Sequence, residues 1–202
     1  MNQGAISNIV QQRYLLYENC ENGQNQWFND TGSINFTYRN GNELEGHLAF
    51  YITASGGMTK RFAGSASLAS ASLHFRVRVP SLASATDIAG FCLGTTNSGT
   101  NFNGFANVQT NGTVRIYENG ASSFTATSAT MTANTAYHVW IERRQNLNSK
   151  LWFSTSSIRP ASGSANFAQV NVGSSNLNSM VWFGYGQAIA IDDIQVEAIG
   201  AT

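Results

Sequence analysis

The chain has 202 residues, a formal net charge of zero and only 11% Asp, Glu, Lys and Arg, against the roughly 25% typical of soluble domains. Its eleven basic residues are scattered, so the sequence offers no basic footprint and excludes nucleic acid as the expected partner. The polar surface is built from Asn, Ser, Thr, Gly and Gln, which is common in extracellular and virion proteins.

The amino-terminal residues carry no targeting signal. Residues 1–12 are polar and lack the basic and apolar regions of a signal peptide. No apolar stretch approaches the ~20 residues of a membrane span, so membrane insertion is not expected. We expect residues 1–12 to be an arm that frays or docks on a neighbour, and residues 13–202 to be one domain. If the chain is complete, general secretory export is not expected.

The first half of the domain consists of short runs that alternate apolar and polar residues, as half-buried strands do. Arg76 and Arg78 share one side of such a run; we favour a solvated strand face there over an anion contact. Two cysteines cannot make a disulfide framework, and we favour a buried free thiol at Cys92 over a Cys20–Cys92 bridge. The expected strands are 13–18, 33–38, 44–53, 71–79 and 87–94.

The second half continues the pattern, with Asn-Gly and other Gly/Ser/Asn clusters between the runs. About a dozen short strands, no helix of three turns and no repeat predict an all-β domain of two stacked antiparallel sheets. The inward members of each alternation are the expected core. The expected strands here are 104–110, 113–118, 121–127, 136–144, 149–154, 167–171, 179–185 and 188–197.

Several of these segments resemble the concanavalin A-like lectin/glucanase superfamily, in its laminin-G-like branch. The resemblance implies a jelly-roll β-sandwich, a fold shared by lectins, adhesion modules, glucanases, polysaccharide lyases and virion surface proteins. It does not by itself imply a function. The segments that carry it are LLYENCENG (15–23) followed by Trp27, LHFRVRVP (73–80), GTVRIYENG (112–120), TAYHVWIE (135–142) and IDDIQV (191–196).

No catalytic set is complete in the sequence. Glucanases of this superfamily carry Glu-x-Asp-x-(x)-Glu on one strand, and the nearest match, Glu43-Leu44-Glu45-Gly46-His47, lacks the Asp and the last Glu. A lyase needs His, Tyr, Arg and Gln to converge, whereas His74 and His138 alternate with apolar residues and are expected to be structural. We therefore predict a protein that is not an enzyme.

The resemblance also implies a structural Ca²⁺ site, held by an N-terminal Glu and an Asp of the last strand. In this sequence that pair is Glu21 and Asp193, with carbonyl oxygens completing the ligands. Asp192 and Asp193 point to opposite faces of a regular strand and do not easily share one ion. We favour the alternative, in which Asp192 is exposed and Asp193 caps loop amides, and expect no other cofactor.

Aromatic residues are the candidate ligand-binding groups, because sugar C–H faces stack on rings. Trp140 and Trp152 fall out of phase with the apolar residues beside them and are expected to face outward. Tyr185 lies between two glycines at a loop edge. The two tryptophans are interpreted as a sugar platform on the concave sheet, as residues covered by a loop, or as a subunit contact.

The function predicted first is a structural or binding protein on a particle surface, most plausibly a viral capsid decoration or fibre protein. Its partners are expected to be copies of itself or other capsid proteins, with cell-surface glycans as a further expectation and a homo-oligomer as the assembly. The alternative is a carbohydrate-binding or adhesin module of a secreted bacterial system, which would be extracellular. A glycoside hydrolase or lyase is ranked last.

Overall fold

The computed structural model describes residues 16–18, 28–29, 36–39, 49–53, 57–61, 70–92, 102–118, 124–172 and 180–199. These residues form fifteen strands: β1 (Leu16–Glu18), β2 (Phe28–Asn29), β3 (Phe36–Arg39), β4 (Ala49–Ile52), β5 (Met58–Arg61), β6 (Ser70–Arg78), β7 (Thr86–Cys92), β8 (Phe102–Val108), β9 (Thr113–Tyr117), β10 (Phe124–Thr130), β11 (Ala136–Arg144), β12 (Asn148–Ser154), β13 (Phe167–Asn171), β14 (Met180–Tyr185) and β15 (Ile189–Ala198).

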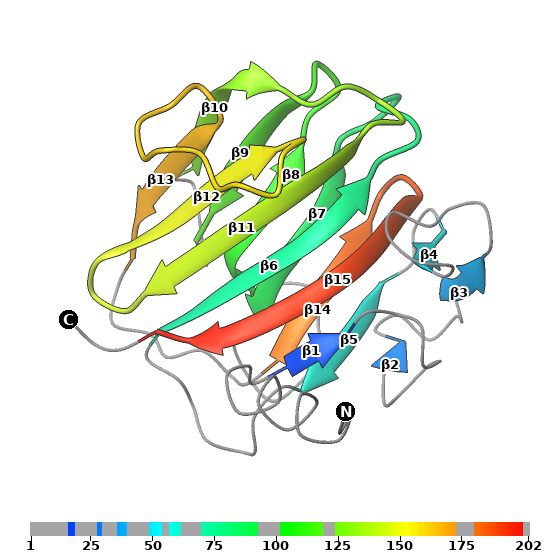
Figure 1. The fold of residues 1–202 in the computed structure, drawn as a ribbon, viewed down its shortest axis with the longest axis horizontal. Coiled ribbons are helices and arrows are strands. Elements are labelled where there is room, and N and C mark those ends of the chain that lie inside the picture. The colour runs from blue at the N-terminus through cyan, green and yellow to red at the C-terminus, as the bar shows by residue number, and fades with distance from the viewer. Residues whose placement is uncertain are drawn as a thin grey trace, which may run out of the picture.

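The strands form two stacked antiparallel sheets (Figure 1). The eight-stranded sheet has the order β13-β12-β11-β6-β15-β4-β3, with β1 also paired to β15, and the seven-stranded sheet has the order β10-β9-β8-β7-β14-β5-β2. The chain passes repeatedly between the sheets, so β6 pairs with β11 on one side and with β15 on the other. The predicted all-β sandwich of two antiparallel sheets is confirmed, with more strands than the dozen expected.

The core lies between the sheets, where the inward members of the alternating strands meet. Side chains along β11 are alternately buried and partly exposed over its whole length. Phe75 on β6 contacts Phe183 on β14 edge to face, with ring centroids 5.2 Å apart, and such a pair adds about 0.5–1.5 kcal/mol beyond its buried area. Each expected core residue whose side chain is described is buried, because period-two alternation fixes which face is apolar.

Two strands were not predicted from the sequence. β5 reads Met-Thr-Lys-Arg after a glycine, which offers no apolar alternation, and β2 has only two residues. Both pair at the edge of the seven-stranded sheet beyond β14. Their pairing is therefore decided by the neighbouring strand rather than by local sequence. The proposed arm at residues 1–12 and both Cys20 and the Cys92 side chain lie outside the described parts.

One ion pair lies inside the sandwich and joins the two sheets. Arg143 on β11 is fully buried, and its Nε is 3.7 Å from Oε2 of Glu118, which directly follows β9. Glu118 Oε1 accepts hydrogen bonds from the Gly104 backbone N–H on β8, at 2.8 Å, and from the Ser149 hydroxyl on β12. Burial nevertheless raises the pKa of Glu118 and lowers the pKa of Arg143. Desolvation therefore outweighs the attraction between the two charges.

β15 contains a β-bulge at Asp193. Asp192 lies opposite Arg76, whereas Gln195 lies opposite His74, so three steps along β15 match two steps along β6. Asp193 has a φ of 48°, in the left-handed region that Asn and Asp tolerate better than most residues. Its backbone N–H donates to Oδ1 of Asp192 at 2.8 Å.

The bulge changes which residues of β15 face the core. An extra residue in one strand reverses its alternation, so Ile191 before the bulge and Ile194 after it are both buried. The expectation that Asp192 is exposed is wrong: it is 1% exposed. The reason is that it lies in the paired part of a central strand, with its carboxylate turned back to the bulge backbone.

Candidate functional site

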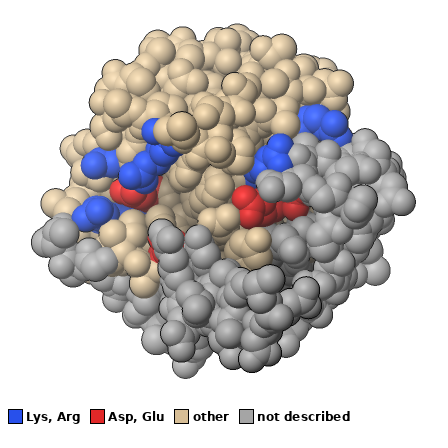
Figure 2. Space-filling view, viewed as in Figure 1, with Lys and Arg blue, Asp and Glu red and all other residues tan. Residues whose placement is uncertain are grey.

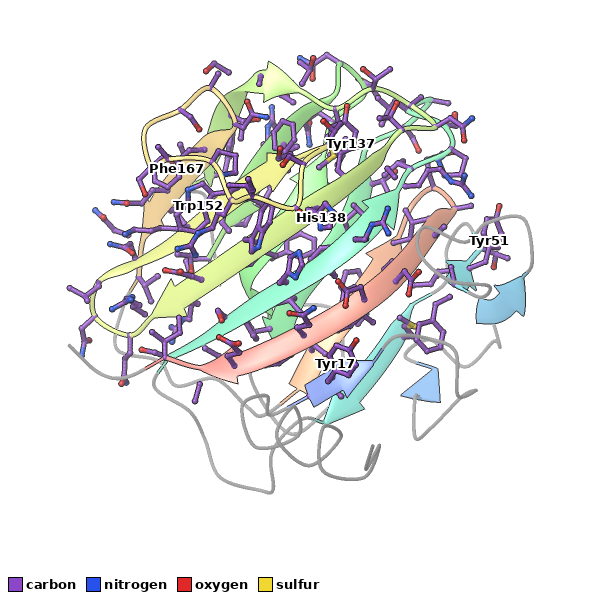
Figure 3. All side chains as sticks on the ribbon, viewed as in Figure 1. Tyr17, Tyr51, Tyr137, His138, Trp152 and Phe167 are labelled. Atoms are coloured by element: carbon purple, nitrogen blue, oxygen red, sulfur yellow. The ribbon has the colours of Figure 1, made fainter. Side chains whose placement is uncertain are left out.

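A row of side chains crosses the outward face of the eight-stranded sheet. The register places six residues directly opposite one another, at Cβ separations of about 4.5–5.5 Å. In Figure 3, Phe167 and Trp152 of this row lie side by side over β13 and β12, and His138, which is next to the row, lies over β11. The alternation had predicted that both tryptophans of this row face outward, and the register adds that they are adjacent. The row is Phe167, Trp152, Trp140, His74, Gln195 and Tyr17.

Two histidines meet in the middle of this face. His74 Nε2 and His138 Nδ1 are 3.1 Å apart and form a hydrogen bond between β6 and β11. Their ring planes differ by 7° and their centroids are 5.3 Å apart, so the imidazoles meet edge to edge. The Trp140 ring is nearly parallel to both, at 12° and 5.0 Å from His74 and at 19° and 5.8 Å from His138. We call His74, His138 and Trp140 the imidazole–indole cluster.

A pocket of about 450 Å³ opens beside this cluster, within the usual size range of small-molecule sites. Its lining includes the rings of His74 and Trp140 and the polar side chains of Glu142, Gln195 and Glu197. Flat rings accept an apolar ligand face, while carboxylate and amide oxygens accept hydrogen bonds from hydroxyl groups. This combination suits a ligand that has both C–H faces and hydroxyl groups.

Burial lowers the pKa of His74 below its usual value, and Arg76 acts in the same direction. Asp193, Gln195 and Glu197 oppose that shift but do not cancel it. His74 is therefore neutral near pH 7, when one of its ring nitrogens is a donor and the other an acceptor.

Glu142 connects the pocket to the loop between β12 and β13. Its Oε1 forms an ion pair with Arg159 Nη1, and its Oε2 is 4.0 Å from Arg144 Nε. The side chain of Arg159 is 45% exposed, and an exposed pair of this kind contributes only about 0–1 kcal/mol to stability. Its role is positional, because it holds the loop over the outward face. Figure 2 shows charged side chains of both signs on this face, with uncharged surface between them.

Trp152 faces outward but is covered. It is 2% exposed and lies outside the hydrophobic core cluster. Its ring lies 5.2 Å from that of Phe167, at 47°, and the Arg159 guanidinium is 4.6 Å from its centroid. The indole Nε1 is buried without a hydrogen-bond partner among the described residues. The structure thus places Trp152 beneath the loop, while Trp140 borders the pocket.

The remaining predicted site residues lie elsewhere. Tyr185 ends β14 opposite Asp87, in the other sheet, and its side chain is outside the described parts. Asp193 Oδ1 accepts a hydrogen bond from Gln195 Nε2 at 2.8 Å, and Glu21 falls outside the described residues. Within the described ranges, no group of three or more His, Cys, Asp or Glu side chains is arranged to hold a metal ion. Helices able to cross a membrane are likewise absent from the part of the chain described.

Sequence reasoning gave His74 and His138 only a structural role and did not single out Glu142 or Arg159. A signal was present, because His138, Trp140 and Glu142 share the outward phase of one strand. The sequence could not show that β6 and β11 are neighbours, since 57 residues separate the end of one from the start of the other. That pairing is what brings His74 to Trp140.

Comparison with known proteins gives no match to a family model and none to a curated protein. Solved structures do match in fold. The binding domain of Paraclostridial Mosquitocidal Protein 1 aligns with a TM-score of 0.62 at 13% identity, over 96% of this chain and 50% of that one. The T. cruzi calreticulin globular domain aligns with a TM-score of 0.59 at 9% identity, over 93% of this chain and 89% of that one.

Botulinum neurotoxin type C, which depends on interaction with two ganglioside molecules to enter cells, aligns with a TM-score of 0.60. The identity is 11%, and the match covers 97% of this chain and 50% of that one. This chain therefore spans about half the length of the toxin chains that it matches. At such low identities the likeness is one of fold, that of a β-sandwich.

Proposed function

We propose that this chain is a non-enzymatic glycan-binding module and that the pocket beside Trp140 holds the sugar. The observation that carries the proposal is that one pocket contains both stacked rings, those of His74 and Trp140, and side-chain oxygens that accept hydrogen bonds. Neither component alone would be specific, because aromatic residues also cover sheets and carboxylates are common on surfaces.

The chemistry of the pocket suits one face of a sugar ring. The C–H face stacks on the Trp140 indole, an arrangement that buries apolar area while the hydroxyl groups stay at the edge. Glu142, Gln195 and Glu197 line the same pocket and accept hydrogen bonds from those hydroxyl groups. The His74 ring lines the same pocket and lies nearly parallel to the Trp140 indole.

The structural neighbours support the same reading. Type C neurotoxin interacts with gangliosides, and a solved structure holds the binding domain of botulinum neurotoxin DC in complex with SialylT. We place this chain, by extension, with the concanavalin A-like, laminin-G-like binding modules. We further propose that it acts as a homo-oligomer on a particle surface, as a capsid decoration or fibre protein; an extracellular bacterial adhesin is the alternative setting.

A glycan array tests the proposal with one pocket variant and one matched control. Trp140→Ala removes the stacking ring and is expected to lower binding at least tenfold. Phe124→Ala removes a ring that is 46% exposed on the other sheet and is expected to leave binding unchanged. Near-ultraviolet circular dichroism confirms that both variants are folded. Equal losses in both variants, or a blank array with the folded chain, would contradict the proposal.

A hydrolase is the second candidate, because two carboxylates flank the pocket. Glu142 and Glu197 both lie opposite Ser72, from the strands on either side of β6, so two interstrand spacings of about 4.8 Å separate their backbones. Inverting glycosidases place two carboxyl groups about 6.5–9.5 Å apart. Sugar release by the wild type that is lost in Glu197→Gln would favour hydrolysis; binding without release favours the module.

A further inference from the structure

The hydrogen bond between the two histidines depends on protonation. The 3.1 Å contact joins His74 Nε2 to His138 Nδ1, so one of these nitrogens must carry a proton and the other must not. Each neutral imidazole has one N–H, and a first added proton can go to an outer nitrogen and leave the contact intact. A second added proton makes both rings imidazolium ions, with an N–H on each side of the gap and no acceptor between them.

We propose that this pair is an acid-operated release device for the pocket: when both histidines are protonated, the rings separate and the Trp140 platform is lost. The inference rests on the proposed glycan-binding function and adds its regulation. Trp140 lies nearly parallel to both imidazoles, so moving them apart removes the surface against which the indole is packed. His74 itself lines the pocket, so its displacement also changes the pocket wall.

The charges around the pair set its response. On β6, the positive charge of Arg76 disfavours protonation of His74. Arg76 also lies opposite His138 in the register. On β15, Asp193 and Glu197 favour a charged His74 and Gln195 hydrogen-bonds to it. Glu142 on β11 and Arg159 of the β12–β13 loop line the same pocket and are paired with each other.

Because the two rings share one hydrogen bond at 3.1 Å, protonation of one changes the proton affinity of the other, and we expect the pair to titrate in two coupled steps rather than as two independent groups. The device predicts a defined dependence of affinity on pH. If the doubly protonated pair does not bind, each sugar bound below the second titration step releases one proton, and affinity falls about tenfold per pH unit there. Above that step the affinity is flat, because uptake of the first proton leaves the gap hydrogen bond in place.

The first arm of the test needs no sugar. Imidazole and indole NMR signals of the full chain are followed from about pH 8 to pH 4.5, with Trp140→Phe and His47→Gln to assign signals. We expect two separated steps for His74 and His138, and a Trp140 indole shift that follows only the second. In His138→Asn, whose amide replaces Nδ1 as a partner, His74 should titrate in one step. Independent titration of the two histidines, or a Trp140 signal that ignores both, overturns the device.

The second arm repeats the printed glycan array at about pH 7.5, 6.5, 5.5 and 4.5. The wild type should lose its signals below the second step, and His138→Asn should retain them at the lowest pH where it stays folded. Equal loss in both proteins overturns the regulation while leaving the binding function standing. A blank array at every pH contradicts the binding function and with it the release of a sugar, whatever the NMR arm shows for the imidazole pair.

Discussion

Glu142 and Arg143 are adjacent on β11 and point to opposite faces of the sheet. Each forms an ion pair, but the two pairs lie in very different environments. Arg143 faces inward to Glu118 and is fully buried. Glu142 faces outward to Arg159, whose side chain is 45% exposed. The same two residue types thus serve once as a link between sheets and once as a tether for a loop beside the pocket.

The contrast separates stability from function on one strand. In the buried pair, removing one partner leaves an uncompensated charge away from water, which costs far more than the pair itself contributes. In the exposed pair, water and salt replace either partner at little cost. We therefore expect substitutions at the inward position to destabilise the fold and those at the outward position to alter the site.

The largest expected effect is that of Arg143→Ala. It leaves the Glu118 carboxylate buried beside an empty space, and we expect the free energy of unfolding to fall by about 3–5 kcal/mol, measured by urea denaturation. The double variant Glu118→Gln/Arg143→Met keeps a hydrogen-bond acceptor for Gly104 and Ser149 without either charge. It should recover most of the loss; additive losses in the double variant would contradict the comparison.

The dependence of stability on pH is the next effect in size. Because burial lowers the pKa of His74, the unfolded chain binds more protons than the folded chain between that lowered pKa and the ordinary histidine value. The contribution of His74 to the free energy of unfolding therefore falls as pH falls through this window. Denaturant melts at several pH values should show the decrease in the wild type and a smaller one in His74→Phe. Equal slopes would mean that His74 is not the group responsible.

Arg159→Ala should have the smallest effect on stability, within about 1 kcal/mol, yet it should uncover a tryptophan. Without the guanidinium over its ring, Trp152 becomes accessible, and acrylamide should quench the fluorescence of the chain more strongly than in the wild type. Arg115→Ala is the matched control, since Arg115 lies 4.2 Å from the centre of the Phe124 ring on the other sheet. Similar quenching in both variants would show that Arg159 does not cover Trp152.

The local alternation of apolar and polar residues predicted the features that depend on a single strand, namely which residues face the core and which face outward. The alternation in residues 136–144 gave the inward face, and with it the outward position of Trp140. It also held an unused signal: the inward phase of Tyr137, Val139 and Ile141 continues to Arg143, and that of Val114 and Ile116 continues to Glu118. Two opposite charges at inward positions indicate a buried pair.

The sequence could not predict the contacts that arise when distant strands become neighbours in the sheet. The edge-to-edge contact of His74 and His138 requires the register of β6 against β11, which no local propensity encodes. The cover on Trp152 requires a loop to fold back over its own strand, and the sequence analysis left platform, loop cover and subunit contact as three alternatives. The bulge was implicit in the sequence IDDIQV, because Ile191 and Ile194 cannot both face the core on a regular strand.

The bulge in β15 also determines which of its residues face the core on either side of Asp193. Asp193 is the single position where odd-numbered inward residues give way to even-numbered ones. Deleting it would leave a regular strand, because two steps from Asp192 to Gln195 would then match the two steps from Arg76 to His74. Ile194 and Val196 would still face the core, and Gln195 and Glu197 would still face the pocket. The extra residue is thus what allows two isoleucines three positions apart, Ile191 and Ile194, to share one buried face.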